Sequence, residues 1–399
     1  MSEPLRDSRE RVSAPLAAPG YALFSLGFRP FYLLAGAFSA FSVLLWAAQY
    51  SGWLPSAYLQ GPLWHGHEML FGFTMAVIAG FLLTAVRAWT GQPTPTGVPL
   101  MALAALWLLG RALVLTPLGT AAAVVNAAFP VALAVAIGIP LVRSRNVRNY
   151  FFVGLLVLIG GLILTLHLAL QGALELPPRL GLLLGLDVVL FIMTVMGGRV
   201  IPMFTNSGVP GAGATRHPLV EKLALGSVLL LFVADLLQLD PAVVAAIAVF
   251  GAIAHGVRLG FWRPWRTSAA PLVWILHAAY AWIVAHLALR ALAGAGWLPE
   301  SNAVHALTVG AIGGLTLGMM TRTARGHTAR PLAADGYELT CFLLIQVAAV
   351  VRVSGGMGSQ GMHMASVQLS GLLWAAAFGL FAVRYWPVLT RPRLDGKPG

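Results

Sequence analysis

The sequence predicts an all-α, polytopic integral membrane protein with twelve transmembrane helices. Of its 399 residues, 58% are hydrophobic and only 10% are charged, whereas a soluble chain carries roughly 25% charged residues. Apolar segments long enough to cross a bilayer, which takes about 20 residues, recur along the whole chain. The 44 glycines fit this class, because small residues let membrane helices approach one another closely.

The predicted spans follow one another through short connections. The first follows a polar segment that contains three prolines, and the second is apolar after its opening residues. Glycine and proline separate the second from the third, and arginines separate the fourth from the fifth. In chain order the spans are 29–49, 65–86, 98–117, 121–142, 150–171, 180–203, 219–238, 241–260, 270–294, 302–322, 336–353 and 362–386. They form one membrane domain, 21–388, between polar tails at 1–20 and 389–399.

The distribution of Lys and Arg predicts the orientation. With the N-terminus in the cytoplasm, 21 of the 25 Lys and Arg residues fall on the cytoplasmic side, as the positive-inside rule requires. The four on the outer side are Arg111, Arg179, Arg290 and Arg352. Both termini are therefore expected in the cytoplasm, with no signal peptide. Because the +12 charge lies in these connections, it does not indicate a nucleic-acid partner.

The second span opens with the motif WHGHEMLFGF at 64–73. Its two histidines and its carboxylate stand where the bilayer begins, and such groups are costly to desolvate, so they usually serve a function. His65 and His67 point about 200° apart on a continuous helix, so one can face a cofactor while the other faces a loop or a second metal. Glu68 can orient a histidine or carry a proton.

Six of the ten histidines fall in the outer part of the predicted membrane. They lie on five different spans, and an unpartnered polar group there costs several kcal/mol. They are His65, His67, His167, His286, His305 and His363. This convergence predicts a bound metal or haem, with these six as candidate ligands. The alternative is that each is an ordinary hydrogen-bonded histidine near a helix end.

A shift of 238 residues places His67 on His305 and also aligns Gly72 with Gly310 and Arg87 with Arg325. A weaker match brings in the sixth span, where Asp187 lies near the position of the histidines. Spans 2, 6 and 10 then mark three four-helix units. In this interpretation His67 and His305 lie at the same depth in the membrane and ligate a b-type haem. The single cysteine excludes the Cys-x-x-Cys-His attachment of a c-type haem.

Two of the outer arginines are candidates for pairing with haem propionates, namely Arg290 and Arg352. A structural role at helix ends is an equally good interpretation of both. For Asp187, the alternatives are a proton path and a hydrogen bond to a neighbouring helix.

Several motifs resemble the NnrS family of bacterial inner-membrane proteins. They are GFRPF at 27–31, WHGHEMLFGF at 64–73, GGRVIPMFTN at 197–206, HALTVGAIGGLTLGMMTR at 305–322 and RGHTARPL at 325–332. The resemblance covers nearly the whole chain. It implies a role in the response to nitric oxide, haem and copper as cofactors, and site residues among His65, His67, Glu68 and His305. It does not imply which histidine binds which metal.

The four-helix repeat also resembles subunit I of haem–copper oxidases and the catalytic subunit of nitric oxide reductases. In those proteins histidines on spans 2, 6, 7 and 10 hold two haems and a metal. This sequence departs from that pattern, because its sixth and seventh spans contain no histidine. A second metal would need other ligands, with His65, His167, His286 and His363 as candidates.

The leading functional hypothesis is a membrane haem protein that reduces or otherwise detoxifies nitric oxide in the outer half of the membrane. The electron donor would be a quinol or a small molecule, and Glu68 and Asp187 would carry protons, because carboxylates inside spans are rare and tend to be functional. The first alternative is a non-enzymatic protein that binds, senses or transports haem, copper or nitric oxide. The second is a transporter without a cofactor, which internal repeats and buried charges also suit.

Overall fold

The computed structural model describes residues 20–54 and 58–397, and in these residues all regular structure is helical. The predicted N-terminal tail lies outside them except for Gly20. The helices are α1 Phe28–Tyr50, α2 Pro62–His67, α3 Met75–Thr90, α4 Val98–Leu113, α5 Gly119–Arg143, α6 Phe151–Leu170, α7 Arg179–Gly208, α8 Pro218–Leu236, α9 Pro241–Phe261, α10 Pro271–Gly294, α11 Glu300–His305, α12 Gly314–His327, α13 Gly336–Gly355 and α14 Gln360–Thr390.

Two of these helices continue through a π-helical segment. Glu68–Thr74 joins α2 to α3, and Ala306–Gly313 joins α11 to α12. Counted as continuous helices, the described chain has twelve long helices, as the sequence predicted. Ten are long and apolar enough to cross a membrane. Of the other two, α4 has only 16 residues, and α8 carries Glu221, Lys222 and Asp235.

The helices form three four-helix units. The 238-residue shift that aligns His67 with His305 also aligns the first residues of α2 and α11, Pro62 and Glu300, and those of α4 and α13, Val98 and Gly336. In the middle unit, α7 and α8 begin nearly midway between these pairs. The units are therefore α1–α5, α6–α9 and α10–α14, which agrees with the predicted repeat.

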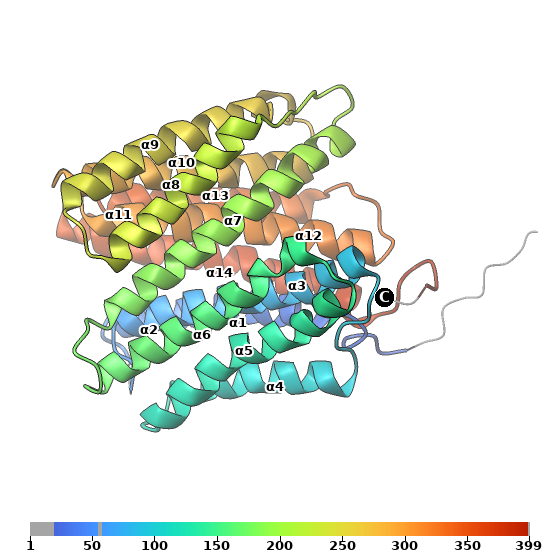
Figure 1. Ribbon diagram of the computed structural model, residues 1–399, viewed down its shortest axis with the longest axis horizontal. Helices are drawn as coiled ribbons and strands as arrows, with labels where there is room; N and C mark the ends of the chain where they lie inside the picture. The colour runs from blue at the N-terminus through green and yellow to red at the C-terminus, as the bar shows by residue number, and fades with distance from the viewer. Residues whose placement is uncertain (1–19, 55–57, 398–399) are drawn as a thin grey trace, which may run out of the picture.

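The three units close into a ring. The first helix of each unit packs against the last helix of the preceding one, with α6 on α5, α10 on α9, and α1 on α14. The second helix of each unit, namely α2–α3, α7 and α11–α12, is the most buried of the candidate spans. These three helices form the centre of the molecule, and the helices of all three units run side by side along its long axis (Figure 1).

The two ends of the bundle differ. The starts of α2 and α11 lie at one end, and the C-terminal ends of α3 and α12 lie at the other, near the C-terminus (Figure 1). A hydrogen bond from the Ala22 amide to the Thr390 carbonyl oxygen, 2.8 Å long, places both ends of the described chain at that second end. The assignment of this end to the cytoplasm remains a prediction from the Lys and Arg distribution.

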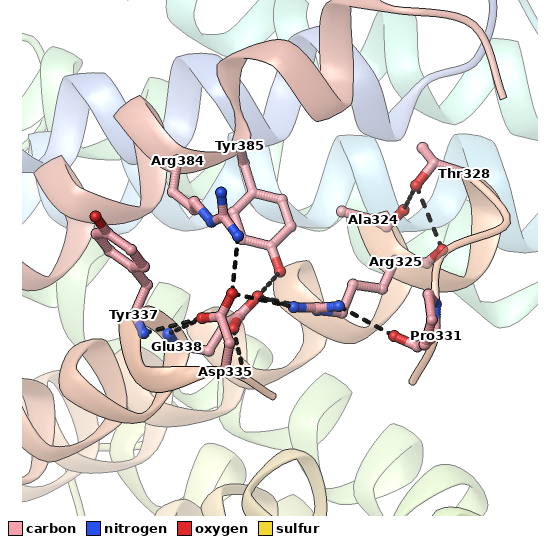
Figure 2. Close-up of polar contacts among 9 residues, drawn as sticks. All are labelled: Ala324, Arg325, Thr328, Pro331, Asp335, Tyr337, Glu338, Arg384 and Tyr385. Atoms are coloured by element: carbon pink, nitrogen blue, oxygen red, sulfur yellow. Dashed lines mark hydrogen bonds and ion pairs between the residues drawn. The ribbon is translucent and has the colours of Figure 1, made fainter. Parts of the chain in front are cut away.

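An ion-pair network ties the third unit together at the second end (Figure 2). The Arg325 guanidinium donates from Nη2 to Oε1 of Glu338 over 2.7 Å, and the Tyr385 hydroxyl donates to the same oxygen over 2.7 Å. Asp335 caps α13 in a capping box with Glu338, and Arg384 donates to Asp335 over 2.8 Å. The network therefore joins α12, α13 and α14.

Candidate functional site

A cavity of about 770 Å³ lies at the end of the bundle where α2 and α11 begin. Helices from all three units supply its walls, and its volume falls in the roughly 300–1,000 Å³ range of cofactor sites. Most lining residues are apolar; those with a charged, imidazole or indole side chain are Trp46, His65, Arg179, Asp235, Glu300, His305, Arg352 and Trp374. An apolar cavity with few polar groups suits a large, mainly apolar ligand.

His65 lines this cavity from α2 and is held by an aromatic contact. Its ring stacks on Trp46 of α1, with centroids 4.9 Å apart and planes 18° apart. Its Nδ1 is buried without a hydrogen-bond partner among the described residues. A buried imidazole without partners is costly, so the site favours a ligand that takes up a ring nitrogen of His65.

His305 lines the same cavity from α11. Its Nδ1–H donates to the Ser301 carbonyl oxygen one helical turn earlier, over 2.6 Å. This bond fixes the tautomer in which Nε2 carries the lone pair, as is usual for a metal-ligating histidine. Nε2 itself has no hydrogen-bond partner within the part of the chain that the structure describes. The Nε2 lone pair of His305 is therefore available to a ligand in the cavity.

His67 does not line the cavity, and it is thereby separated from His305, its predicted partner as a haem ligand. The two histidines of the motif lie two residues apart on α2, which sends their rings to opposite sides. His67 Nδ1 lies 2.7 Å from Oε1 of Glu68, and its Nε2 lies 3.2 Å from Nε2 of His167. Arg111 of α4 donates from Nη1 to the same Glu68 oxygen over 2.9 Å.

A single set of tautomers satisfies this chain of hydrogen bonds, which runs from the exposed Gln171 to the buried Glu68. Gln171 donates to the Tyr58 hydroxyl over 3.0 Å, and that hydroxyl donates to Nδ1 of His167 over 3.2 Å. His167 Nε2–H then donates to His67 Nε2, and His67 Nδ1–H donates to Glu68. Because both nitrogens of each ring are used, His67 and His167 have no lone pair free for a metal.

The remaining two candidate histidines lie outside the cavity wall. His286 of α10 is buried, and its Nδ1–H donates to the Ala303 carbonyl oxygen over 2.8 Å, which ties α10 to α11. His363 at the start of α14 packs against Tyr50, with ring centroids 6.5 Å apart. The structure thus brings two of the six predicted histidines, His65 and His305, to one cavity.

All four arginines predicted on the outer side belong to the site or to the buried groups beside it. Arg179 and Arg352 line the cavity. Arg111 neutralises Glu68. Arg290 does not line the cavity, because its guanidinium is taken up by Asp187, 3.3 Å away, and by Asp235. Of the two predicted propionate partners, only Arg352 is therefore available.

The Asp187 side chain belongs to a buried cluster at the edge of the cavity. Asp187 of α7 and Asp235 of α8 share the single guanidinium of Arg290, and Oδ2 of Asp187 has no hydrogen-bond partner among the described residues. Asp235 also lines the cavity. The cluster contains two carboxylates and one guanidinium. A proton held between the two carboxylates would therefore make it electrically neutral.

The sequence interpretation missed Trp46, Arg111 and Asp235 as site residues. For Asp235 and Arg111 a signal existed, since a charged residue inside an apolar span usually has a buried partner. Trp46 had no such signal, because tryptophans are common near span ends and its contact with His65 comes from packing α1 against α2.

A metal held by protein side chains alone finds no donor set in the described residues, where no group of three or more His, Cys, Asp and Glu side chains converges. The donors therefore do not fit a copper site with three protein ligands. Haem brings its own four nitrogens and needs only one or two imidazoles from the protein. His65, His305, the apolar walls and Arg352 fit that requirement.

The family described as NnrS protein matches residues 22–393. No curated protein matches the chain.

Proposed function

Because the chain belongs to the NnrS family, membrane proteins of the nitric oxide response, we propose that this protein binds a b-type haem in the cavity between α2, α7 and α11 and reduces nitric oxide there. The observation that carries this proposal is the cavity itself, which two imidazoles from two equivalent helices line without a hydrogen bond to another side chain.

The residues of the cavity have separate roles in this proposal. His305, fixed by the Ser301 carbonyl oxygen, would ligate the haem iron, and His65 would be a second imidazole within the same cavity. Arg352 and Arg179 pair with the two carboxylates of the ligand. When bound, haem supplies an iron that binds nitric oxide and exchanges electrons. The apolar walls admit a neutral gas and exclude water.

Nitric oxide reduction also needs protons and electrons. Two molecules of nitric oxide, two electrons and two protons give one nitrous oxide and one water. We assign the electrons to a quinol or a small soluble donor, and the proton at the cavity wall to the Asp187–Asp235 pair. Asp235 lines the cavity, and Oδ2 of Asp187 is the atom that can hold the proton. Glu68 serves instead to hold His67 and Arg111.

The test is nitric oxide uptake by the purified, haem-loaded protein on an electrode, with a quinol as reductant and nitrous oxide measured as product. We expect uptake with one nitrous oxide formed for every two nitric oxide molecules, lost in His305→Ala and kept in the control His363→Ala. A haem spectrum that responds to nitric oxide without any turnover would replace the enzyme with a binding or sensing protein. Absence of haem would favour the transporter.

A further inference from the structure

Two of the motifs that resemble the family, at 27–31 and 325–332, play no part in the cavity. Both lie at the opposite end of the bundle, where α12 ends beside the start of α1 and the C-terminal segment. The ring of His327 packs against Phe28 with centroids 5.6 Å apart. Arg393 donates from Nη1 to the His327 carbonyl oxygen over 2.9 Å. His327 is therefore the point at which these three segments meet.

Positive charge is concentrated around His327. The charges of Arg393, Arg29 and Arg87 all act on its ring, and those of Arg330 and Arg393 act on Arg29. Arg29 is buried and donates to the carbonyl oxygens of Leu389 and Arg391 at the end of α14. Arg29 thus holds the C-terminal segment in place, close to the charges of Arg330 and Arg393.

The internal repeat shows that Arg87 lacks a counter-ion that its equivalent has. The 238-residue shift aligns Arg87 with Arg325, whose guanidinium is neutralised by Glu338 (Figure 2). The same shift places Leu100 at the position of Glu338. Arg87 is only partly exposed, and it makes no ion pair with any residue in 20–54 or 58–397. The first unit therefore has the arginine of the Arg325–Glu338 ion pair, as Arg87, but lacks the glutamate that neutralises it.

Arg330 also lacks an acidic partner among the described residues. Its Nη1 is buried without a hydrogen-bond partner among the described residues. Burial lowers the pKa of Arg330, and the guanidinium groups of Arg325, Arg384 and Arg391 lower it further, against the raising effect of Tyr385. Of Arg87, Arg330 and Arg393, only Arg393 has an acidic partner in the described chain, namely Asp395. A bound anion would offset this repulsion.

We propose that Arg87, Arg330 and His327 form a binding site for the phosphate group of an anionic phospholipid. Guanidinium groups bind phosphate through paired hydrogen bonds, and basic pockets between membrane helices bind anionic head groups. The two helices concerned end at Thr90 and His327. Their ends place the cations at the level of the lipid head groups, which favours a lipid over a free phosphate. This inference does not depend on haem or on nitric oxide.

The test is native mass spectrometry of the protein in detergent, titrated with phosphatidylglycerol or with phosphatidylethanolamine carrying the same acyl chains. We expect phosphatidylglycerol to bind preferentially. The double variant Arg87→Gln, Arg330→Gln should bind it about thirtyfold more weakly, since each of the two lost cations contributes to lipid attraction. The control Arg384→Gln removes an exposed arginine at the same end that already pairs with Asp335, and it should bind as the wild type does.

A further variant tests the missing counter-ion directly. Leu100→Glu restores in the first unit the acid that the third unit has at Glu338, and it should weaken binding of phosphatidylglycerol while every arginine remains. Size-exclusion chromatography checks that each variant is folded. Equal binding of the two lipids, or unchanged binding in the Arg87→Gln, Arg330→Gln variant, would overturn the site. Displacement of the lipid by inorganic phosphate at equal concentration would overturn the lipid as its ligand.

Discussion

Among the candidate histidines, only His305 combines three properties. It lines the cavity, its Nδ1–H is fixed by the Ser301 carbonyl oxygen, and its Nε2 has no partner in the described chain. His65 also lines the cavity, but a stacking contact with Trp46 holds it instead of a hydrogen bond. The His305 ring is thus held by a hydrogen bond and the His65 ring by stacking. Substitution of the two histidines should therefore have different effects on haem binding.

His305→Ala should abolish haem binding, because the fixed ligand is lost. His65→Ala should keep most of the haem but change its spectrum, since the second imidazole is lost. His67→Ala should keep both the haem and its spectrum. The measurement is the haem content and optical spectrum of each purified variant. Loss of haem in His67→Ala together with full retention in His305→Ala would contradict the assignment.

The buried Glu68–Arg111 pair supports a second prediction. Glu68→Gln leaves the Arg111 guanidinium buried without a carboxylate, and breaking such a pair costs about 3–5 kcal/mol. Thermal unfolding in detergent should therefore show a large loss of stability. In a double-mutant cycle, adding Arg111→Met should restore part of it. If Glu68→Gln unfolds at the wild-type temperature, the pair has no such structural role.

Residue spacing predicted His65, His67 and His305 as candidate ligands, but it did not predict that His65, and not His67, lines the cavity with His305. The repeat aligns His67 with His305 by position, whereas the direction of each ring depends on where its helix begins and on the turn that follows. Pro62 starts α2 three residues before His65, and no pattern in the sequence fixes the rotation of that short helix against α1. The contact with Trp46 sets it.

At the scale of the helices, the two π-helical segments are the feature that composition and periodicity did not predict. Each follows directly on a histidine, His67 or His305, and each contains an equivalent glycine, Gly72 or Gly310. A wider turn frees backbone groups, and the Trp107 indole N–H takes up the Gly72 carbonyl oxygen over 3.0 Å. Such turns are frequent at functional sites, and we expect these two to position the histidine that precedes each of them.

Gly310→Ala tests this role. A Cβ at Gly310 would meet the Trp282 ring of α10, and overpacking of this kind costs about 1–3 kcal/mol. The turn should shift, and haem affinity should fall because His305 moves with it. At Gly154 a Cβ meets nothing within 4 Å, so Gly154→Ala is the matched control. Haem titration of both variants measures the effect, and equal affinities would show that the turn does not position His305.

For the whole molecule, hydropathy was enough to predict the twelve helices, and their spacing was enough to suggest the units. The closure of these units into a ring was not predicted, because it depends on contacts between helices far apart in sequence, such as α1 with α14. The cavity follows from this closure, since its walls come from all three units. Asp235 joins the site for the same reason.

The orientation of the ring can be tested by labelling. Glu175 lies in the connection between α6 and α7, and Lys397 lies near the C-terminus at the opposite end. In a Cys341→Ala background, a membrane-impermeant maleimide should label Glu175→Cys in intact cells and label Lys397→Cys only after lysis. The Lys and Arg distribution predicts this result. The reverse labelling pattern would mean that the opposite topology holds, with the cavity on the cytoplasmic side of the membrane.

The central claim is that the cavity holds haem between His65 and His305, and the reduced-minus-oxidised optical spectrum of the purified wild-type protein, with haem quantified against protein, tests it most directly. We predict a b-type spectrum that shifts when nitric oxide is added, with one haem per chain for this one cavity. Protein that stays folded but takes up no haem when haem is supplied in excess would contradict the claim.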